Sequence, residues 1–174
     1  MKIKRWNTCV SCATLLVFAL FVFVAPTSAA TLQLPKGTDV KVKFNPGMKV
    51  SSGTLDKGVP ILCTLAEPVK IGDIVVVEAG AQATATVTDV KKSGGGGKGG
   101  YIKVSFNELE TKGAYKSVDG SKIKLSGYVE NTGKGKGFIP YLIFVIFLKG
   151  SQGEINTDAV YTVKVAESII LQSE

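Results

Sequence analysis

The sequence predicts an all-β protein, a small barrel or sandwich of short antiparallel strands, preceded by a cleavable signal peptide. Three observations predict this fold class. Apolar and polar residues alternate with a period of two in several runs, as in strands that bury one face. The 20 glycines all follow residue 30 and lie mostly between these runs, where turns are needed. No segment after residue 30 has the 3.6-residue apolar stripe of a helix.

The first thirty residues have the pattern of a secretory signal peptide. Basic residues at Lys2, Lys4 and Arg5 precede an apolar run over 13–24, and small residues follow at 26–30. The apolar run is shorter than the roughly 20 residues that a membrane-spanning helix needs. We therefore expect a signal peptide over 1–30 with cleavage after Ala30 or one residue earlier. The remainder, 31–174, would be a single exported domain that is periplasmic or extracellular, or associated with an outer membrane.

Four runs after residue 30 carry the strand pattern most clearly. In each run, three apolar positions alternate with lysine, threonine or serine. Such a run buries its apolar positions against a core and leaves its polar positions in water. The apolar positions expected in the core are Val40, Val42, Phe44, Ala83, Ala85, Val87, Ile102, Val104, Phe106, Tyr161, Val163 and Val165.

A short pattern recurs before three of the strands, at 34–37, 77–80 and 155–158. Each unit has an apolar residue, then a three-residue turn that ends in Gly37, Gly80 or Asp158, and apolar residues three, five and seven positions later. Glycine readily adopts the left-handed backbone that tight turns require, and aspartate tolerates it. The pattern predicts three similar corners of a barrel, or it is a coincidental match of the kind that any β protein offers.

The composition excludes several kinds of function. The chain has no histidine, and Arg5 is its single arginine. Catalytic sites based on histidine and bidentate recognition of phosphate or guanine are therefore excluded after residue 30. Removal of residues 1–30 would take away three of the 21 basic residues and leave 18 against 14 acidic residues, a net charge of +4. This charge is too small to indicate nucleic-acid binding.

A family resemblance follows from the order of several short motifs. They are Leu34-Pro35-Lys36-Gly37-Thr38, Val50-Ser51-Ser52, Asp56-Lys57-Gly58, Ala66-Glu67-Pro68-Val69, Val77-Glu78-Ala79-Gly80 and Val163-Lys164-Val165-Ala166-Glu167. Their order over most of 32–171 resembles the periplasmic β-barrel domain of the type IV secretion subunit that bridges the inner and outer membranes (TrbI-like). It is also similar to small exported β-barrel proteins of unassigned function. The resemblance implies a barrel, with residues 138–148 at the place in the chain order where that family has its outer-membrane segment.

The segment 138–148 is the most unusual part of the chain after residue 30. It contains no charged residue and is bounded by Lys134, Lys136 and Lys149. As a helix it would be about 16 Å long, too short to cross a bilayer. Two interpretations remain open: a strand buried in the core, or an exposed apolar patch that contacts a membrane or a second copy of the chain. The candidate contact residues are Phe138, Tyr141, Ile143, Phe144, Val145 and Phe147.

A glycine-rich stretch over 93–100 is expected to be a hairpin loop. It does not match a phosphate-binding loop, because Gly99 follows Lys98 where that motif needs serine or threonine before a helix. Lysines in and near this loop and the 133–137 stretch form a candidate basic rim for lipid head groups or anionic glycans. The rim residues are Lys91, Lys92, Lys98, Lys134 and Lys136.

Residues of catalytic type are few. Cys63 alternates with Ile61 and Leu65, so we expect a buried core thiol rather than a reactive one. Glu108 and Glu110 would share a strand face, but no sugar-binding aromatic platform accompanies them, and we expect surface acids. No cysteine, aspartate or glutamate cluster has metal-ligand spacing.

The function expected from the sequence is that of an exported cell-envelope protein with a non-enzymatic structural, assembly or membrane-surface role. Its expected partners are a membrane surface, another envelope component or a second copy of the chain, and no nucleic acid or cofactor is expected. The alternative is a soluble periplasmic or extracellular module that binds anionic glycan or a protein through its lysine- and glycine-rich loops.

Overall fold

The computed structural model describes residues 30–95, 97–135 and 150–173, which form β-strands joined by turns and loops, with no helix among them. The described strands are β1 (Thr31–Leu34), β2 (Asp39–Phe44), β3 (Val50–Ser51), β4 (Pro60–Leu65), β5 (Val69–Ile71), β6 (Ile74–Val77), β7 (Gln82–Lys91), β8 (Tyr101–Leu109), β9 (Tyr115–Ser117), β10 (Ile123–Ser126), β11 (Tyr128–Thr132), β12 (Glu154–Ile155), β13 (Val160–Val165) and β14 (Ile169–Ser173).

Six of the strands close into an antiparallel barrel. Their order is β10-β13-β2-β4-β7-β8, and β8 pairs back onto β10 through Ile123 opposite Leu109. Closure leaves these strands without a free edge at the seam, which protects the sheet from pairing with other chains. The predicted all-β fold is confirmed, and of the two predicted forms, a small barrel or a sandwich, the structure has the barrel.

The barrel encloses the core that the alternating runs predict. Val40, Val42 and Phe44 on β2 are buried, and the predicted positions of β7 and β8 are buried as well. On β13, Val163 and Val165 are buried and Tyr161 is partly buried against the core. The strand period of two therefore determined which face of each strand turns inward.

Three corners of the barrel share one hydrogen-bond geometry. In each, a glycine with positive φ donates its N–H to a buried residue of a neighbouring barrel strand, and that residue's N–H donates to the carbonyl of the residue after the glycine. The exchanges join Gly37 and Thr38 with Val165, Gly58 and Val59 with Val87, and Gly80 and Ala81 with Leu65. Each corner leads directly into β2, β4 or β7, which are adjacent in the barrel.

The predicted repeat is therefore real in two of its three units. The third corner is formed by Leu55 to Gly58 instead of the predicted unit at 155–158. Buried apolar residues follow Gly58 at Ile61, Cys63 and Leu65, three, five and seven positions later. The expectation that Asp158 adopts a left-handed backbone is wrong, because every described residue with positive φ is a glycine. The turn there is held by Asn156 instead, whose Oδ1 accepts the N–H of Asp158 at 3.0 Å.

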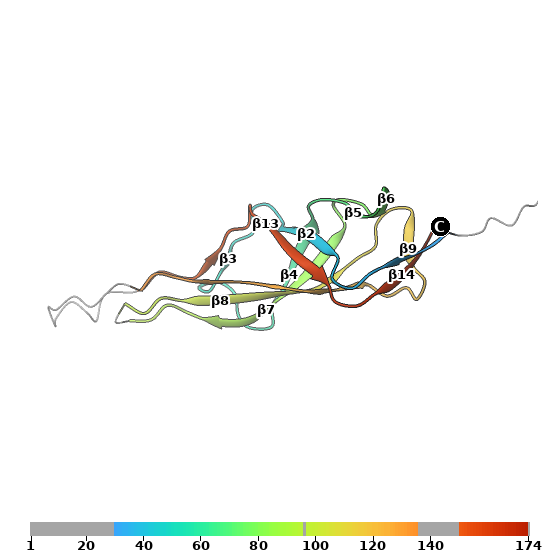
Figure 1. The fold of residues 1–174 in the computed structure, drawn as a ribbon. Helices are drawn as coiled ribbons and strands as arrows, with labels where there is room; N and C mark the ends of the chain where they lie inside the picture. The colour runs from blue at the N-terminus through green and yellow to red at the C-terminus, as the bar shows by residue number, and fades with distance from the viewer. Residues whose placement is uncertain (1–29, 96, 136–149, 174) are drawn as a thin grey trace, which may run out of the picture.

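Three small sheets extend the barrel. One sheet, of order β1-β14-β9, lies at the end of the molecule that holds both described termini (Figure 1). The β5–β6 hairpin lies near the same end, whereas the β3–β12 pair lies toward the other. Beyond that pair, β7 and β8 continue into a narrow projection (Figure 1). We call this projection the arm and define it as residues 88–95, 97–100, 128–135 and 150–153.

Candidate functional site

The arm is a narrowing continuation of the barrel wall. β7 and β8 remain paired as far as Lys91 opposite Tyr101, and β11 runs beside β8 from Tyr128 to Thr132. Beyond the strands, the N–H of Gly133 donates to the carbonyl of Gly100 at 2.7 Å, and the N–H of Gly100 donates to Ser151 at 2.9 Å. Segments from three distant parts of the sequence thus meet in one thin structure (Figure 1).

Glycines make this close approach of backbones feasible. A Cβ atom on Gly99 would overlap the carbonyl group of Gly133, and one on Gly133 would overlap the carbonyl oxygens of Ser151 and Gln152. A Cβ on Gly150 would overlap the carbonyl of Lys98. The glycine-rich stretches, predicted from sequence as hairpin loops, are therefore packed against one another at the end of the arm.

A buried polar network fixes the base of the arm. The Ser52 hydroxyl donates to Oε1 of Gln152 at 2.7 Å and accepts the N–H of Gly153 at 3.0 Å. The Gln152 side chain also accepts the N–H of Ser93 at 3.0 Å and donates its Nε2 to Oγ of Ser93 at 2.7 Å. Ser52 and Ser93 are both buried, so this satisfied network holds three chain segments in one arrangement.

Sequence reasoning missed this network. Ser52 and Gln152 are 100 residues apart, and the Val50-Ser51-Ser52 motif does not indicate a partner for Ser52. Isolated serine and glutamine residues are ordinary surface residues in a single sequence. No local signal could have identified the pair, because its contact depends on the fold of the whole barrel.

The two described ends that flank residues 136–149 lie side by side at the end of the arm. The N–H of Ser151 donates to the carbonyl of Lys134 at 3.2 Å, and its hydroxyl donates to the same oxygen at 3.0 Å. The N–H of Gly150 donates to the carbonyl of Gly94 at 3.5 Å. Gly135 and Gly150, the described residues on either side of this interval, therefore lie in one place next to the glycine-rich loop.

All six predicted contact residues fall in this interval. Phe138, Tyr141, Ile143, Phe144, Val145 and Phe147 lie outside the described residues. The described residues on either side of the interval, Gly135 and Gly150, lie at the end of the arm.

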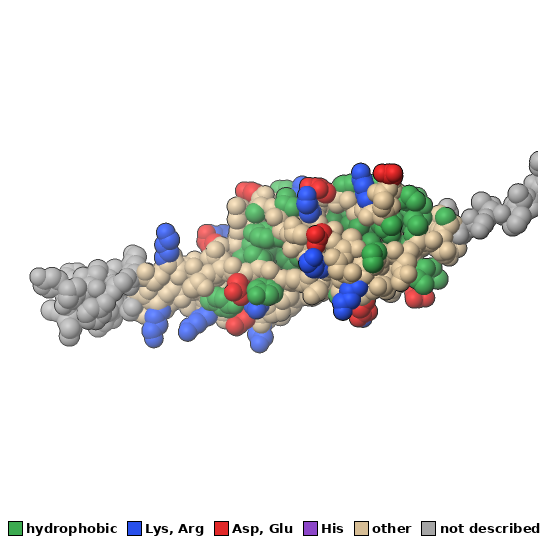
Figure 2. All heavy atoms as spheres, in the orientation of Figure 1, with side chains coloured by type: hydrophobic (Ala, Val, Ile, Leu, Met, Phe, Trp, Pro, Cys, Tyr) green, Lys and Arg blue, Asp and Glu red, His purple; other side chains and the backbone are tan. Residues whose placement is uncertain are grey.

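The described members of the predicted basic rim belong to the arm or lie at its border. Lys91, Lys98 and Lys134 are exposed, and no ion pair with a described residue engages them. Lys92 differs, because its Nζ lies 3.1 Å from Oδ1 of Asp56. Figure 2 shows lysine side chains standing out from both sides of the arm. Lys136 lies outside the described residues.

An aromatic and charged cluster covers the outer face of β8 and β11 where the arm begins. The Tyr101 hydroxyl donates to Glu130 at 2.9 Å, and this hydrogen bond raises the pKa of Tyr101 above its ordinary value. Nζ of Lys103 lies 3.9 Å from the ring centroid of Tyr128, a cation–π contact, and 3.6 Å from Glu130. These four side chains therefore pair with one another on the surface where the arm begins.

The acidic pair considered from sequence is engaged in ion pairs. Nζ of Lys122 lies 3.0 Å from Glu110 and 3.7 Å from Glu108. The hydrogen bond with Glu110 and the charges of both carboxylates raise the pKa of Lys122. Glu108 and Glu110 are exposed, and a lysine bridges them, which favours the expected role as surface acids.

Cys63 is a free thiol buried in the core, 1 % exposed, as the strand pattern predicts. Burial raises its pKa from 9.0 to about 12. The thiolate is the reactive form of cysteine, and it is almost absent at neutral pH when the pKa is so high.

We therefore expect the thiol of Cys63 to be inert toward a thiol-specific disulfide reagent between pH 7 and pH 9 in the folded chain from residue 31. Unfolding in urea at the same pH should expose it and allow complete reaction, because the unfolded thiol has its ordinary pKa near 9.0. The measurement is the absorbance of the released thiolate with and without urea. Rapid reaction in the absence of urea would show that β4 opens readily.

Among the described residues, no group of three cysteines or carboxylates is arranged to hold a metal ion. The described residues include no helix that is long and apolar enough to cross a membrane. Comparison of the sequence with protein-family models and with curated proteins finds no match. The functional argument therefore rests on the arm and the surface of the barrel.

Proposed function

We propose that the protein is an exported, non-enzymatic component of the cell envelope that makes structural or assembly contacts through the end of its arm. The apolar segment 138–148 is its contact element, and the arm holds this element away from the barrel. The observation that carries the proposal is the placement of Gly135 and Gly150 side by side at the end of the arm, held through Lys134, Ser151 and Gly94.

The composition of the barrel and its core supports this proposal. Its six strands and its buried apolar core are all supplied by described residues. The described residues therefore supply a closed barrel and a buried core by themselves. An uncharged apolar sequence added to a chain that already has such a core favours a contact with a membrane or another protein.

The glycine packing and the Ser52–Gln152–Ser93 network provide the second line of support. Buried hydrogen-bonded networks and close backbone contacts restrict a structure to one arrangement. A rigid stem of this kind suits an element that must present a segment at a defined distance from its domain.

The test is fractionation of native cells, with the envelope pellet washed first in high salt and then in alkaline carbonate. The protein should stay in the pellet through both washes, because an apolar contact resists salt and alkali. Ile143→Asp should remain folded and move to the soluble fraction, whereas Leu62→Asp, at a side chain 51 % exposed on the barrel, should stay in the pellet. A wild-type protein that is soluble before any wash would contradict the proposal.

A second candidate is binding of anionic glycan or lipid head groups by the basic rim. It is favoured by Lys91, Lys98 and Lys134, which are exposed and make no ion pair with described residues. Salt screens exposed charges, so this function predicts release of the protein in the high-salt wash. The combined variant Lys98→Gln and Lys134→Gln would then appear in the soluble fraction without any wash.

A further inference from the structure

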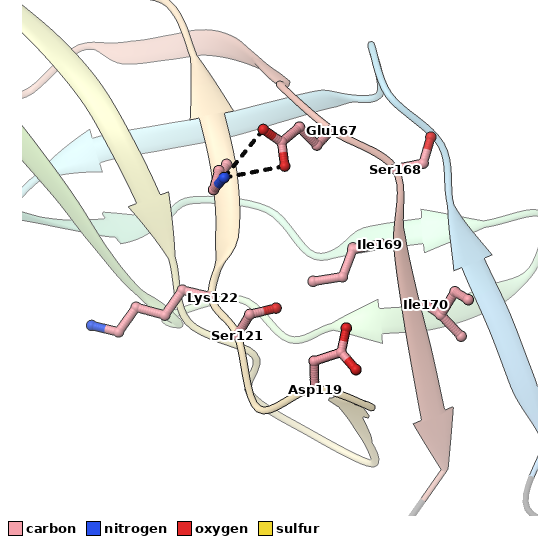
Figure 3. Close-up of a pocket in the computed structure, with 8 residues that line it drawn as sticks. Asp119, Ser121, Lys122, Glu167, Ser168, Ile169 and Ile170 are labelled. Atoms are coloured by element: carbon pink, nitrogen blue, oxygen red, sulfur yellow. Dashed lines mark hydrogen bonds and ion pairs between the residues drawn. The ribbon is translucent and has the colours of Figure 1, made fainter.

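A groove lies beside β14 (Figure 3), at the end of the molecule opposite the arm, where Figure 1 places β14. Its two walls are chain segments that are hydrogen-bonded at both ends of the groove. The N–H of Val118 donates to Ile170 at 3.2 Å, and the N–H of Ala166 donates to Lys124 at 2.9 Å. Between these bonds the segments separate and leave a hollow of about 320 Å³. It is lined by Asp119, Ser121, Lys122, Lys124, Glu167, Ser168, Ile169 and Ile170.

The groove is lined by two isoleucines, two serines and four charged side chains, of which Asp119 and Glu167 are acidic. Ile170 is 54 % exposed, and Val118, directly across the strand pair from it, is 52 % exposed. They are two of the few large apolar side chains of the described chain that water reaches to this extent. The two side chains form a small exposed apolar patch beside the hollow.

Asp119 is the one charged side chain lining the groove that makes no ion pair with a described residue. Nζ of Lys124 lies 3.2 Å from Glu167. Lys122 points away from the hollow (Figure 3), and its Nζ lies 3.0 Å from Glu110. Asp119 makes no ion pair with a described residue, and its carboxylate faces the hollow (Figure 3). The groove therefore matches an apolar ligand that carries a neighbouring positive charge.

The chain itself contains a sequence of this chemistry. Residues 138–148 are uncharged and apolar, and Lys136 and Lys149 flank them closely. We propose that the groove of one copy receives the segment 138–148 of a second copy, with apolar side chains against Val118 and Ile170 and a flanking lysine against Asp119. The inference rests on the proposed function of 138–148 as the contact element, and it names a second copy of the chain as the partner.

The length of the molecule excludes docking within one copy. Gly133 bonds to Gly100 at one end of β8, and Lys124 lies opposite Glu108 near the other end. Eight residues of strand between Gly100 and Glu108 span about 26 Å at about 3.3 Å per residue. A loop over 136–149 with its ends side by side reaches about 25 Å when fully extended, with no residue left to make contacts. Asp119 and Ile170 lie beyond Lys124, so the segment must come from another copy.

Such a contact joins opposite ends of two molecules. It is a heterologous interface, because the surface that one copy offers differs from the surface that it occupies. An open assembly of such contacts retains one unused groove at one end and one unused segment at the other, so the contact produces rings or filaments rather than a symmetric dimer.

The test is sedimentation velocity over a concentration series, with protein purified from a host that processes the signal peptide. Wild-type protein should form oligomers of increasing size. Ile170→Lys, in the groove, and Ile143→Asp, in the segment, should each raise the dissociation constant at least tenfold and sediment as monomers. A one-to-one mixture of the two variants should form a dimer and nothing larger, because the pair retains one intact groove and one intact segment.

The controls separate this inference from the proposed function. Val160→Lys, at a side chain 52 % exposed on β13, should assemble as the wild type does, and Val118→Lys should repeat the effect of Ile170→Lys. Monomeric wild-type protein, normal assembly of both groove variants, or absence of the mixed dimer would overturn the inference. If Ile143→Asp still leaves the envelope pellet in those cases, the proposed function of the segment stands and only its partner is wrong.

Discussion

Replacement of Phe44 by alanine is expected to lower the free energy of unfolding by about 3–5 kcal/mol, the usual cost of removing a large aromatic side chain from a core. Phe44 is 1 % exposed at the end of β2. Its ring centroid lies 5.8 Å from that of Phe106 and 5.6 Å from that of Tyr161, which are themselves 6.3 Å apart. The substitution would leave a cavity among three rings and remove two aromatic contacts.

A loss of this size is large for a domain whose total stability is typically about 5–15 kcal/mol. The measurement is equilibrium unfolding in urea, followed by tyrosine fluorescence or circular dichroism. Leu62→Ala on the adjacent strand β4 is the matched control, since Leu62 is 51 % exposed and should cost less than about 1 kcal/mol. Equal losses from the two substitutions would show that the three rings do not form the tightly packed centre of the barrel.

The core could be predicted from the sequence because burial in a strand has a simple period. Val40, Val42 and Phe44 are buried, and Lys41 and Lys43 between them are exposed. This pattern is local and is read directly along the chain. It indicates which side chains point inward, but it does not identify the strand that lies alongside.

The closure of the barrel and the third corner depend on such distant partners. Gly58 makes its corner through Val87, a residue on a strand that begins 24 positions later. The sequence at 55–58 has the spacing of the other corners, with Ile61, Cys63 and Leu65 after Gly58, but its partner strand β7 is not evident from that spacing. The apolar spacing after Asp158 resembles a corner equally well, although Asn156 makes a different turn there. Local spacing therefore identified corners only where a glycine also supplied the backbone conformation.

The candidate site was likewise predictable in its local features but not in its long-range contacts. Lysines and glycines near 93–100 and 133–135 are evident in the sequence, and the structure places both stretches at the end of the arm. The sequence could not predict that Gly99 packs against Gly133, or that Gln152 joins Ser52 to Ser93. These contacts arise only when the barrel brings together segments that are far apart in the chain.

Replacement of Gly133 by alanine is expected to open the end of the arm and to cost about 3 kcal/mol, the upper part of the usual range for forced overpacking. The added Cβ would overlap the carbonyl oxygens of Ser151 and Gln152, which are backbone atoms and cannot rotate away. Relief requires separation of 133–135 from 150–152. That movement breaks the bonds of Gly133 to Gly100 and of Ser151 to Lys134.

Hydrogen–deuterium exchange distinguishes a local opening from general unfolding. In Gly133→Ala, the amides of Gly100, Gly133 and Ser151 should exchange faster, while amides of β2 and β4 keep their protection, because the closed barrel shares few contacts with the end of the arm. Gly94→Ala is the matched control, since a Cβ there would meet only the Lys98 side chain, at 4.0 Å. If the arm positions 138–148, Gly133→Ala should also weaken envelope retention although the segment is unchanged. Unchanged exchange in Gly133→Ala would mean that the glycines are not needed for close packing, and the arm could not then act as a rigid stem.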